Sequence, residues 1–227
     1  MNEGLRRASA HLLVADLDNP ELDEPTVHHV RRVLRVGDGE AITLTDGAGG
    51  WRSAAFVEGR VEPDGEVRFE PAVYPPLTLA VAAPKGERAE WLVQKCTEAG
   101  VDRIVWLAAE RSVVRWDGER AARHLARLRR IASEAALQSR RVWLPTIEGP
   151  VPAADVLPTA VVAEPGGRPV ASDDTTIAIG PEGGWSEAEV KLARDQVSLG
   201  PNILRVETAA VAAATLMVDR RHGSVAS

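Results

Sequence analysis

This 227-residue chain has one cysteine and no long apolar run. The single cysteine, Cys96, excludes an internal disulfide and a zinc site built from cysteines. No uninterrupted apolar run approaches the roughly 20 residues that a membrane helix needs, and residues 1–11 lack the apolar core of a signal peptide. We therefore expect a protein that works in the cytoplasm without inserting into a membrane.

Common motifs for metal and nucleotide binding are missing as well. His28 and His29 are adjacent, but no third ligand follows at a suitable spacing, so we expect no metal site. The glycine-rich residues 180–184 match neither G-x-G-x-x-G nor a Walker A sequence, because the Lys-Ser/Thr pair and the required glycine spacing are lacking. We therefore expect neither a dinucleotide site nor an ATP-phosphate site at this loop.

The net charge of −6 is spread unevenly along the chain. Residues 1–74 hold 8 basic and 14 acidic side chains, whereas residues 75–227 hold 19 of each. Within the second part, residues 103–141 carry 10 arginines against 4 acids. Arginine supplies 24 of the 27 basic residues, and its planar guanidinium suits phosphates and base edges. The clustering allows an RNA partner without demanding one.

Residues 1–74 have the pattern of a small β-rich domain. A helix is predicted from Glu24 through Leu34, ended by Gly37. We take Tyr74-Pro75-Pro76 as the domain boundary, because it breaks the pattern. Together with three strands, the helix indicates a compact β-barrel. The predicted strands are residues 40–46, 51–57 and 66–70.

Residues 75–227 alternate strands with helices, which predicts a mostly parallel sheet covered by helices on both faces. The fold class is therefore α/β, with domains at 1–74 and 75–227. The predicted strands are residues 77–83, 103–109, 160–163, 176–179 and 197–199. The predicted helices are residues 87–99, 117–139, 186–196 and 207–221.

Two turns near the C-terminus, residues 179–186 and 203–210, are the most informative local features. Each lies between a strand-like run and a helix, where α/β proteins build ligand sites. The glycines of the first turn expose backbone N–H groups to a ligand, although a tight βα turn alone also explains them. In the second, Arg205 and Glu207 bracket a helix start, where they either pair with each other or serve a ligand. The closeness of the two turns predicts one shared pocket.

Five ordered segments carry a resemblance to a known family. The set is similar to the RsmE family, the 16S ribosomal RNA (uracil-N3) methyltransferases of the SPOUT class. Residues 28–38 and 46–49 resemble the PUA-like N-terminal domain of that family. The resemblance runs from about His11 to Leu216, and five motifs in order are far more specific than any one of them. The segments are KGERxEWLxQKxTExGV at 85–101, ERS at 110–112, EAAxQSxR at 134–141, IGPEGG at 179–184 and ILRxETA at 203–209.

The resemblance implies a SPOUT-type parallel-sheet domain with a C-terminal trefoil knot, an exception to the usual unknotted rule. It also implies S-adenosylmethionine as cofactor and a homodimer that uses the knot region. Backbone groups of Gly180 and Gly184 would bind the methionine part, and those of Leu199, Ile203 and Leu204 the adenine. The full expected cofactor-binding set is Ile179, Gly180, Glu182, Gly183, Gly184, Leu199, Gly200, Ile203, Leu204, Arg205, Thr208 and Ala209.

The implied reaction is methyl transfer to N3 of a uridine in 16S ribosomal RNA. N3 must lose its proton, because its lone pair is otherwise unavailable to attack the methyl carbon. The site must therefore position both partners and favour the developing uracil anion. Arg205 is the first candidate for stabilising that anion or holding the target phosphate, and Glu207 either accepts a proton or orients Arg205.

Arginines are the expected contacts to RNA, although each one is also explained as a solvated surface side chain. Departures from the family pattern at Leu137 and Arg140 make these contacts less secure than the cofactor site. Because the protein is acidic, we expect recognition of 16S rRNA within an assembled small ribosomal subunit. The candidates are Arg31, Arg32, Arg35, Arg111, Arg140 and Arg141, with Arg115 as a further one.

Two alternative functions remain open at this point. One is a non-enzymatic RNA-binding or ribosome assembly factor that keeps a PUA-like module on a decayed SPOUT domain. The intact turns at 179–186 and 203–210 argue against decay. The other is a SPOUT methyltransferase that acts on a different RNA, because the target base follows only from family analogy.

Overall fold

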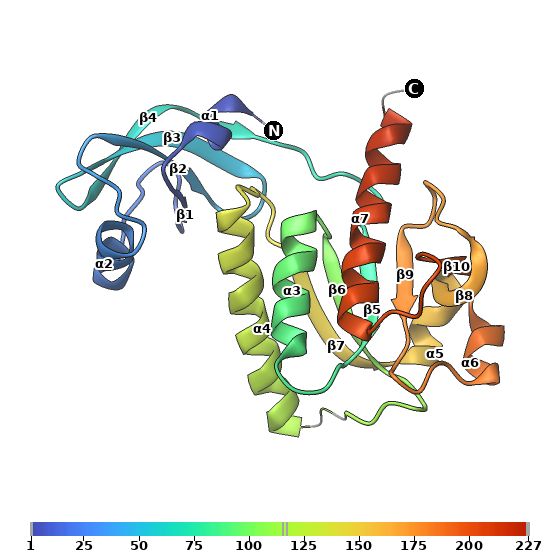
Figure 1. The fold of residues 1–227 in the computed structure, drawn as a ribbon. Coiled ribbons are helices and arrows are strands. Elements are labelled where there is room, and N and C mark those ends of the chain that lie inside the picture. Colours follow the sequence, from blue (N-terminus) through green and yellow to red (C-terminus); the bar gives the residue numbers. More distant parts are fainter. Residues whose placement is uncertain (1, 115, 117, 226–227) are drawn as a thin grey trace. The chain divides into compact units, whose positions relative to one another are not determined.

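The computed structural model describes residues 2–114, 116 and 118–225, with the side chains of 224 and 225 left aside. The chain divides into two compact units (Figure 1). The first contains residues 2–73 and Ala136–Leu144, and the second contains Tyr74–Ala135 and residues 145–225. Each unit is described below by itself.

A four-stranded sheet forms the first unit, in the order β1-β2-β3-β4. Its strands are β1 (His11–Leu13), β2 (Glu40–Thr45), β3 (Gly50–Val57) and β4 (Arg60–Phe69). Strand β1 runs parallel to β2, and the other pairs are antiparallel. The predicted β-rich domain is confirmed, but β1 was not predicted and β4 begins six residues earlier than expected.

Two helices accompany this sheet, α1 (Glu3–Arg7) and α2 (Glu24–Arg32), so the expectation of a single helix was wrong. Helix α2 begins where predicted because the Asp23 carboxylate accepts a hydrogen bond from the Thr26 amide, with Pro25 in the first turn. Val30 of α2 is fully buried in a core with Leu44 and Phe56. The sheet and α2 therefore share one apolar core.

The segment Ala136–Leu144 also belongs to the first unit, which the predicted boundary at residue 74 did not include. The Val142 carbonyl accepts a hydrogen bond from the Gly49 amide at 2.9 Å. The Trp143 indole N–H donates to the Glu70 carbonyl at 2.8 Å. These bonds join two stretches far apart in the sequence, so no local pattern announces them.

A six-stranded sheet forms the second unit, in the order β10-β8-β9-β5-β6-β7. All of its strand pairs are parallel, which confirms the predicted parallel sheet. Strand β7 was not predicted. The strands are β5 (Thr78–Ala82), β6 (Arg103–Ala108), β7 (Thr146–Pro152), β8 (Val161–Pro169), β9 (Thr176–Ile179) and β10 (Asp195–Ser198).

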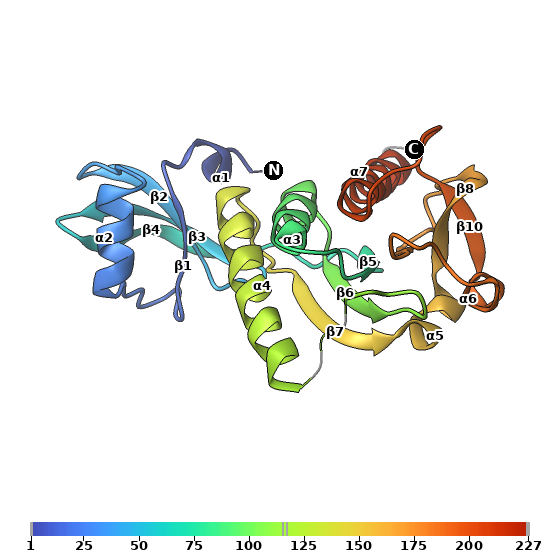
Figure 2. The ribbon, with the colours of Figure 1, turned by 60° about the horizontal axis from the view of Figure 1, so that its bottom comes forward.

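Helices cover both faces of this sheet, as predicted (Figure 2). The first group is α3 (Arg88–Ala99), α4 (Gly118–Gln138) and α7 (Val206–Val225), and the second is α5 (Ala153–Val156), η1 (Leu157–Thr159) and α6 (Glu187–Leu192). Strand β5 shows the alternation: Leu79 and Val81 face the first group, whereas Ala80 and Ala82 face the second. Small residues on one face let α5 and α6 lie close to the strands.

Helix α6 ends at Leu192, so the expected helix over 186–196 was too long. Ala193 is already extended, and Asp195 begins β10 by pairing with Val161 of β8. Pairing with the sheet therefore wins over continuation of a helical pattern.

Cys96 is fully buried in α3, and burial raises the pKa of its thiol to about 12, which fits a packing role.

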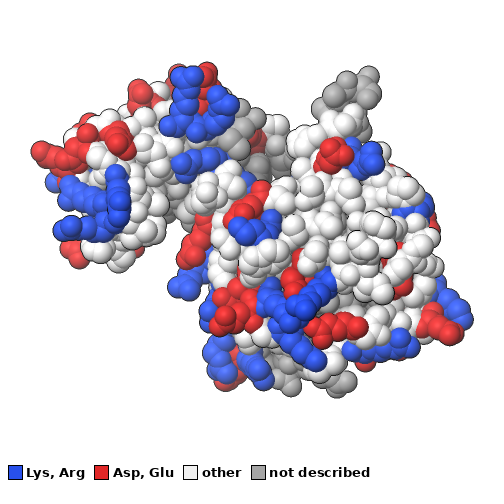
Figure 3. Space-filling view, in the orientation of Figure 1, with Lys and Arg blue, Asp and Glu red and all other residues white. Residues whose placement is uncertain are grey.

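Charged side chains on the face shown in Figure 3 are mixed in sign, and an uncharged area lies over α7. Residues 208–218 of α7 contain no charged side chain. Among the described residues, no helix combines the length and the apolar character that crossing a bilayer requires.

Candidate functional site

A cavity of about 600 Å³ lies at the carboxyl ends of β9 and β10 and beside the middle of β8, the strand between them. Strand β9 ends at Ile179 and delivers Gly180 to the cavity, and β10 ends at Ser198 and delivers Leu199. The first turn of α7 and Arg88 at the start of α3 complete the wall. Open α/β sheets place ligand sites at this edge, where loops leave parallel strands.

Gly180 is required at its position by its contact with a buried tryptophan. A Cβ atom on Gly180 would lie 2.9 Å from Nε1 of Trp185, closer than atoms normally approach. Trp185 is 5% exposed and lines the cavity. Its buried indole N–H has no hydrogen-bond partner in the described part of the chain. The loop therefore brings backbone and an unused donor close to the cavity.

A capping box and one arginine hold this loop in place. The Ser186 hydroxyl accepts from the Glu189 amide, and the Glu189 carboxylate accepts from the Ser186 amide at 2.9 Å. The other oxygen of Glu189 accepts from the Glu110 amide, also at 2.9 Å. Arg111 donates to the carbonyls of Gly183 and Trp185. The loops after β6 and β9 are therefore tied together.

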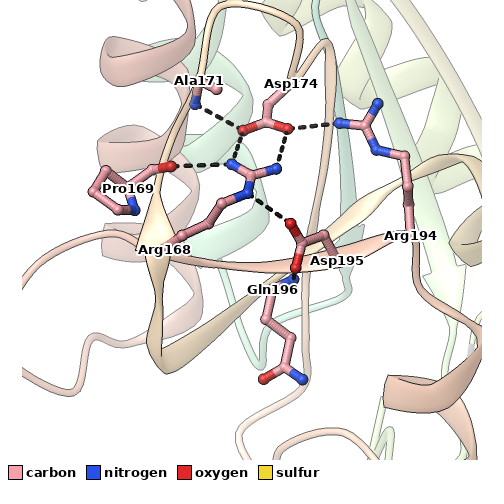
Figure 4. A network of polar contacts seen from close by, with 7 residues as sticks. All are labelled: Arg168, Pro169, Ala171, Asp174, Arg194, Asp195 and Gln196. Atoms are coloured by element: carbon pink, nitrogen blue, oxygen red, sulfur yellow. Dashed lines mark hydrogen bonds and ion pairs between the residues drawn. The ribbon is translucent and has the colours of Figure 1, made fainter.

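A buried aspartate ties strands β8 and β10 together (Figure 4). The Asp174 side chain is 0% exposed and accepts hydrogen bonds from Arg168 of β8, from Arg194 and from the Ala171 amide. Burial opposes its charge, but the bonds from Arg168 and Ala171 outweigh burial and keep its pKa below the usual value. Arg168 also binds Asp195 at the start of β10. The network holds β10 against β8.

The ion pairs at the cavity wall differ from the Arg205–Glu207 pair that the sequence pattern allowed. Glu207 lies 3.7 Å from Nε of Arg88, and Arg88 also donates to Glu182 at 3.1 Å. Arg205 is exposed, and its side chain makes no hydrogen bond or ion pair with the residues that the structure describes. A pair between Arg205 and Glu207 at the helix start is therefore not found. Glu207 is held by Arg88 instead.

Ten of the twelve expected cofactor-binding residues line this single cavity. They are Ile179, Gly180, Glu182, Gly184, Leu199, Gly200, Ile203, Leu204, Arg205 and Ala209. Gly183 and Thr208 lie outside its lining. The structure adds residues that the sequence did not single out: Arg88, Ala163, Glu164, Pro165, Ser198 and Asn202. Arg88 falls within a recognised motif, whereas the 163–165 stretch has no motif that marks it.

Some of the arginines expected to contact RNA are exposed, whereas others donate hydrogen bonds to carbonyl groups of the protein. Arg31, Arg32 and Arg35 are exposed, with Arg31 over the Phe56 ring at 5.7 Å. Arg140 donates to the Ala8 carbonyl at 2.8 Å, and partial burial lowers the pKa of its guanidinium. Arg111 and Arg140 thus have structural bonds in their own units. Arg115 lies outside the described residues, and contacts of all these arginines with RNA stay a prediction.

The cavity walls suit S-adenosylmethionine, the cofactor implied by the resemblance. The volume falls within the range of small-molecule sites. The cavity wall combines apolar side chains with the carboxylate of Glu164, which has no partner among the described residues. For metals, none of the described residues form a group of three or more His, Cys, Asp or Glu side chains able to hold an ion.

Comparison with family models assigns most of the chain. The model described as RNA methyltransferase domain matches residues 72–218. The model described as RNA methyltransferase PUA domain matches residues 22–59. The two matched stretches do not overlap in the sequence.

Individual relatives agree with these matches. Ribosomal RNA small subunit methyltransferase E of Mycobacterium bovis is 34% identical over 221 residues, covering 82% of this chain and 80% of that protein. The crystal structure of a probable rRNA-methyltransferase from Porphyromonas gingivalis is 28% identical with a TM-score of 0.75, covering 95% of this chain and 99% of that one. The Neisseria gonorrhoeae methyltransferase E, solved bound to S-adenosyl methionine, is 29% identical with a TM-score of 0.72, covering 92% and 96%. The chain therefore belongs to the RNA methyltransferase family that contains the ribosomal RNA small subunit methyltransferases E, the RsmE family.

Proposed function

We propose that this protein is an S-adenosylmethionine-dependent methyltransferase that methylates N3 of a specific uridine in 16S ribosomal RNA. The observation that carries the proposal is the cavity at the ends of β9 and β10, lined by ten of the expected cofactor-binding residues, in a chain of the RsmE family. A relative with a TM-score of 0.72 was solved with this cofactor bound.

Within the proposal, the loops around Gly180 and Leu199 hold the cofactor. When bound there, S-adenosylmethionine supplies an activated methyl group. Gly180 leaves room for the Trp185 ring in the cavity wall, so the loop backbone and this ring together shape the side of the site that would hold the methionine part. The bond network of Asp174 holds β10 against β8, the two strands from which Ser198 and Glu164 reach the cavity wall. The protein's part in this half of the site is binding and orientation.

Arg205 is proposed to stabilise the uracil anion that forms when N3 loses its proton. Its guanidinium is exposed at the cavity and has no partner among the described residues, so it is free to meet a substrate. Glu207 is proposed to orient Arg88 rather than to accept the N3 proton. One of its oxygens lies 3.7 Å from Nε of Arg88, and the other, Oε2, is buried and therefore not exposed to the proton of a bound uracil.

The substrate is proposed to be the assembled small ribosomal subunit rather than free RNA. A net charge of −6 gives the protein little non-specific affinity for RNA, so shape and specific contacts must supply recognition. The exposed arginines of α2 are the proposed contacts of the first unit. The site of action is then the cytoplasm, where ribosomes assemble.

A trefoil knot at the C-terminus and a homodimer through this region complete the proposal. Helix α7 presents Thr208, Val211, Ala212 and Thr215 as partly or fully exposed residues without charge, a surface that a second copy can cover closely. Sedimentation at micromolar concentration checks the dimer, and a monomer would contradict this part.

The experiment that tests the function is mass-spectrometric mapping of ribosomal RNA from a strain that lacks the gene. We expect loss of one N3-methyluridine in 16S rRNA and its return when the wild-type chain is supplied. An unchanged 16S rRNA would favour the non-enzymatic assembly factor. A lost methyl group in another RNA would instead favour a methyltransferase of different target.

Arg205→Ala tests the proposed role of the free arginine. We expect methyl transfer to small subunits to fall about 100-fold, because the developing anion loses its counter-charge. Calorimetry should show S-adenosylmethionine affinity within a few-fold of wild type. Lys191→Ala is the control, since it removes an exposed cation of α6 outside the cavity. Near-normal turnover by Arg205→Ala would contradict the role.

A further inference from the structure

The pairing of β8 with β10 is interrupted over five residues in the middle of β8. Part of this interrupted stretch, called the excursion below, lines the cavity. Val162 pairs with Gln196 of β10, but the next β10 residue, Val197, pairs with Arg168. Residues 163–167 therefore have no paired residue on β10, although Gly167 packs against the backbone of Gln196 and Val197, and β8 pairs with β9 only at Val161 and Val162. Of the five, Ala163, Glu164 and Pro165 line the cavity. The structure thus uses a break in pairing to deliver side chains to the site.

Glu164 is the only ionisable side chain that this excursion carries into the cavity wall. It is half-buried and makes no hydrogen bond or ion pair with any residue that the structure describes. Burial raises its pKa above the usual glutamate value. Desolvating a carboxylate without a partner costs stability, which a ligand with hydrogen-bond donors offsets.

The other acidic group of the cavity wall does not share this property. Glu182 is bonded to Arg88 at 3.1 Å and lies 3.6 Å from Lys85. Its charge is therefore already matched by protein cations. Glu164 is the carboxylate that the protein leaves free for a ligand.

Strand order locates Glu164 with respect to a ligand that spans the cavity. Strand β8 lies between β9, which delivers Gly180, and β10, which delivers Leu199. In the proposed function, the Gly180 side holds the methionine part of the cofactor and the Leu199 side holds the adenine. The ribose joins these two parts, so the middle strand faces it. A carboxylate in this place can accept hydrogen bonds from both hydroxyls of a vicinal diol, as acidic residues do for the ribose in dinucleotide sites.

We propose that Glu164 is a cofactor-recognition residue whose carboxylate accepts hydrogen bonds from the ribose hydroxyls of S-adenosylmethionine. This inference rests on the proposed function and adds a residue that its motifs do not include. Glu164 selects ligands by their diol, not by their charge. S-Adenosylhomocysteine, which keeps the ribose but lacks the sulfonium charge, therefore depends on Glu164 as strongly as the cofactor does.

Calorimetric titration of the full chain tests the proposal with three ligands: S-adenosylmethionine, S-adenosylhomocysteine and 3′-deoxyribose S-adenosylhomocysteine. We expect Glu164→Gln to weaken the first two by the same factor, about tenfold, as for a lost hydrogen bond to a charged group. The wild-type protein should bind the deoxy ligand about tenfold more weakly than its parent. The variant should show little further loss with the deoxy ligand, because the two changes remove the same interaction.

Glu187→Gln is the matched control, since Glu187 is an exposed glutamate of α6 that does not line the cavity, and its affinities should equal those of wild type. A loss confined to S-adenosylmethionine would overturn the proposal, because it would place the carboxylate at the sulfonium. Unchanged affinity in Glu164→Gln would overturn it as well. If that variant does not fold, equal wild-type affinities for the parent and deoxy ligands still overturn the proposal. Wild-type protein that binds none of the three would overturn the proposed function itself.

Discussion

Two acidic groups near strand β8 differ in how the protein treats them. Asp174 is 0% exposed, yet each of its oxygens accepts hydrogen bonds, from two arginines and one amide. Glu164 is half-buried and meets no partner in the described part of the chain. Burial removes water from both carboxylates, but only the charge of Asp174 is matched by cations of the fold.

The difference separates structural polar groups from functional ones. A buried charge that the fold fully satisfies keeps strands in register, as Asp174 does for β8 and β10. At the cavity, by contrast, the side chains of Glu164 and Arg205 have no partner among the described residues. A half-buried carboxylate without a partner costs stability, and a ligand that donates hydrogen bonds to it offsets that cost.

The largest effect on stability should come from removing the Asp174 carboxylate, whose charge the fold matches. We expect Asp174→Ala to lower the free energy of unfolding of the second unit by about 3 kcal/mol, because Arg168 and Arg194 lose a buried partner. Chemical denaturation measures this loss. The control is Asp195→Asn, whose side chain is 49% exposed and bonds the same Arg168, and it should cost less than about 1 kcal/mol. Equal losses in the two variants would contradict the comparison.

His11, a buried and hydrogen-bonded side chain of the first unit, should have a somewhat smaller effect on the free energy of unfolding, and this effect should depend on pH. His11 Nε2–H donates to the Arg141 carbonyl, and Nδ1 lies 2.9 Å from the Thr43 hydroxyl. Burial lowers the pKa of His11 from 6.5 to about 4. The unfolded chain therefore binds a proton more readily, and stability is fully present above pH 6.5 and falls as the pH drops. Between pH 7 and pH 5 the loss should be about 2 kcal/mol.

Denaturation of the wild type and of His11→Asn at both pH values checks this expectation. The variant is less stable at pH 7 but should lack this contribution to the pH dependence. An equal loss between pH 7 and pH 5 in both proteins would show that other groups set the acid sensitivity.

The smallest effect should appear in the glycine loop of the cavity. Gly180→Ala places a Cβ 2.9 Å from Trp185 Nε1, so the ring or the loop must shift, and we expect about tenfold weaker binding of S-adenosylmethionine. Gly183→Ala is the control, because its Cβ would meet only ordinary contacts with Arg111, the nearest at 3.5 Å. Its affinity should stay within about twofold of wild type. Calorimetry measures both, and equal affinities would contradict the proposed approach of Gly180 to the ligand.

Elements with strong local patterns were predicted from the sequence, whereas those that depend on distant partners were not. The apolar run of β5 and the helical spacing of α3, ended by Gly100 in a left-handed conformation, both indicate their structure locally. The attachment of Ala136–Leu144 to the first unit depends on bonds to Gly49 and Glu70, far away in the sequence. A short strand such as β1 carries too few residues for a pattern.

The candidate site divides in the same way. Glycine turns and Arg205 were predicted because motifs mark them. Glu164 was not, since it enters the cavity through a break in strand pairing that no local signal encodes. The pairing of Glu207 with Arg88 instead of Arg205 has a geometric reason: residues two apart at a helix start do not face each other.

The central claim is that the cavity at the ends of β9 and β10, with Trp185 in its wall, is the cofactor site. The indole N–H signal of Trp185 in ¹⁵N-labelled protein tests it most directly, with assignment from the spectrum of Trp185→Phe. Trp51 is the internal control, because its buried indole N–H also lacks a described partner but belongs to the first unit. We predict that S-adenosylmethionine shifts the Trp185 signal in a saturable way and leaves the Trp51 signal unchanged. Binding that leaves the Trp185 signal in place would contradict the account.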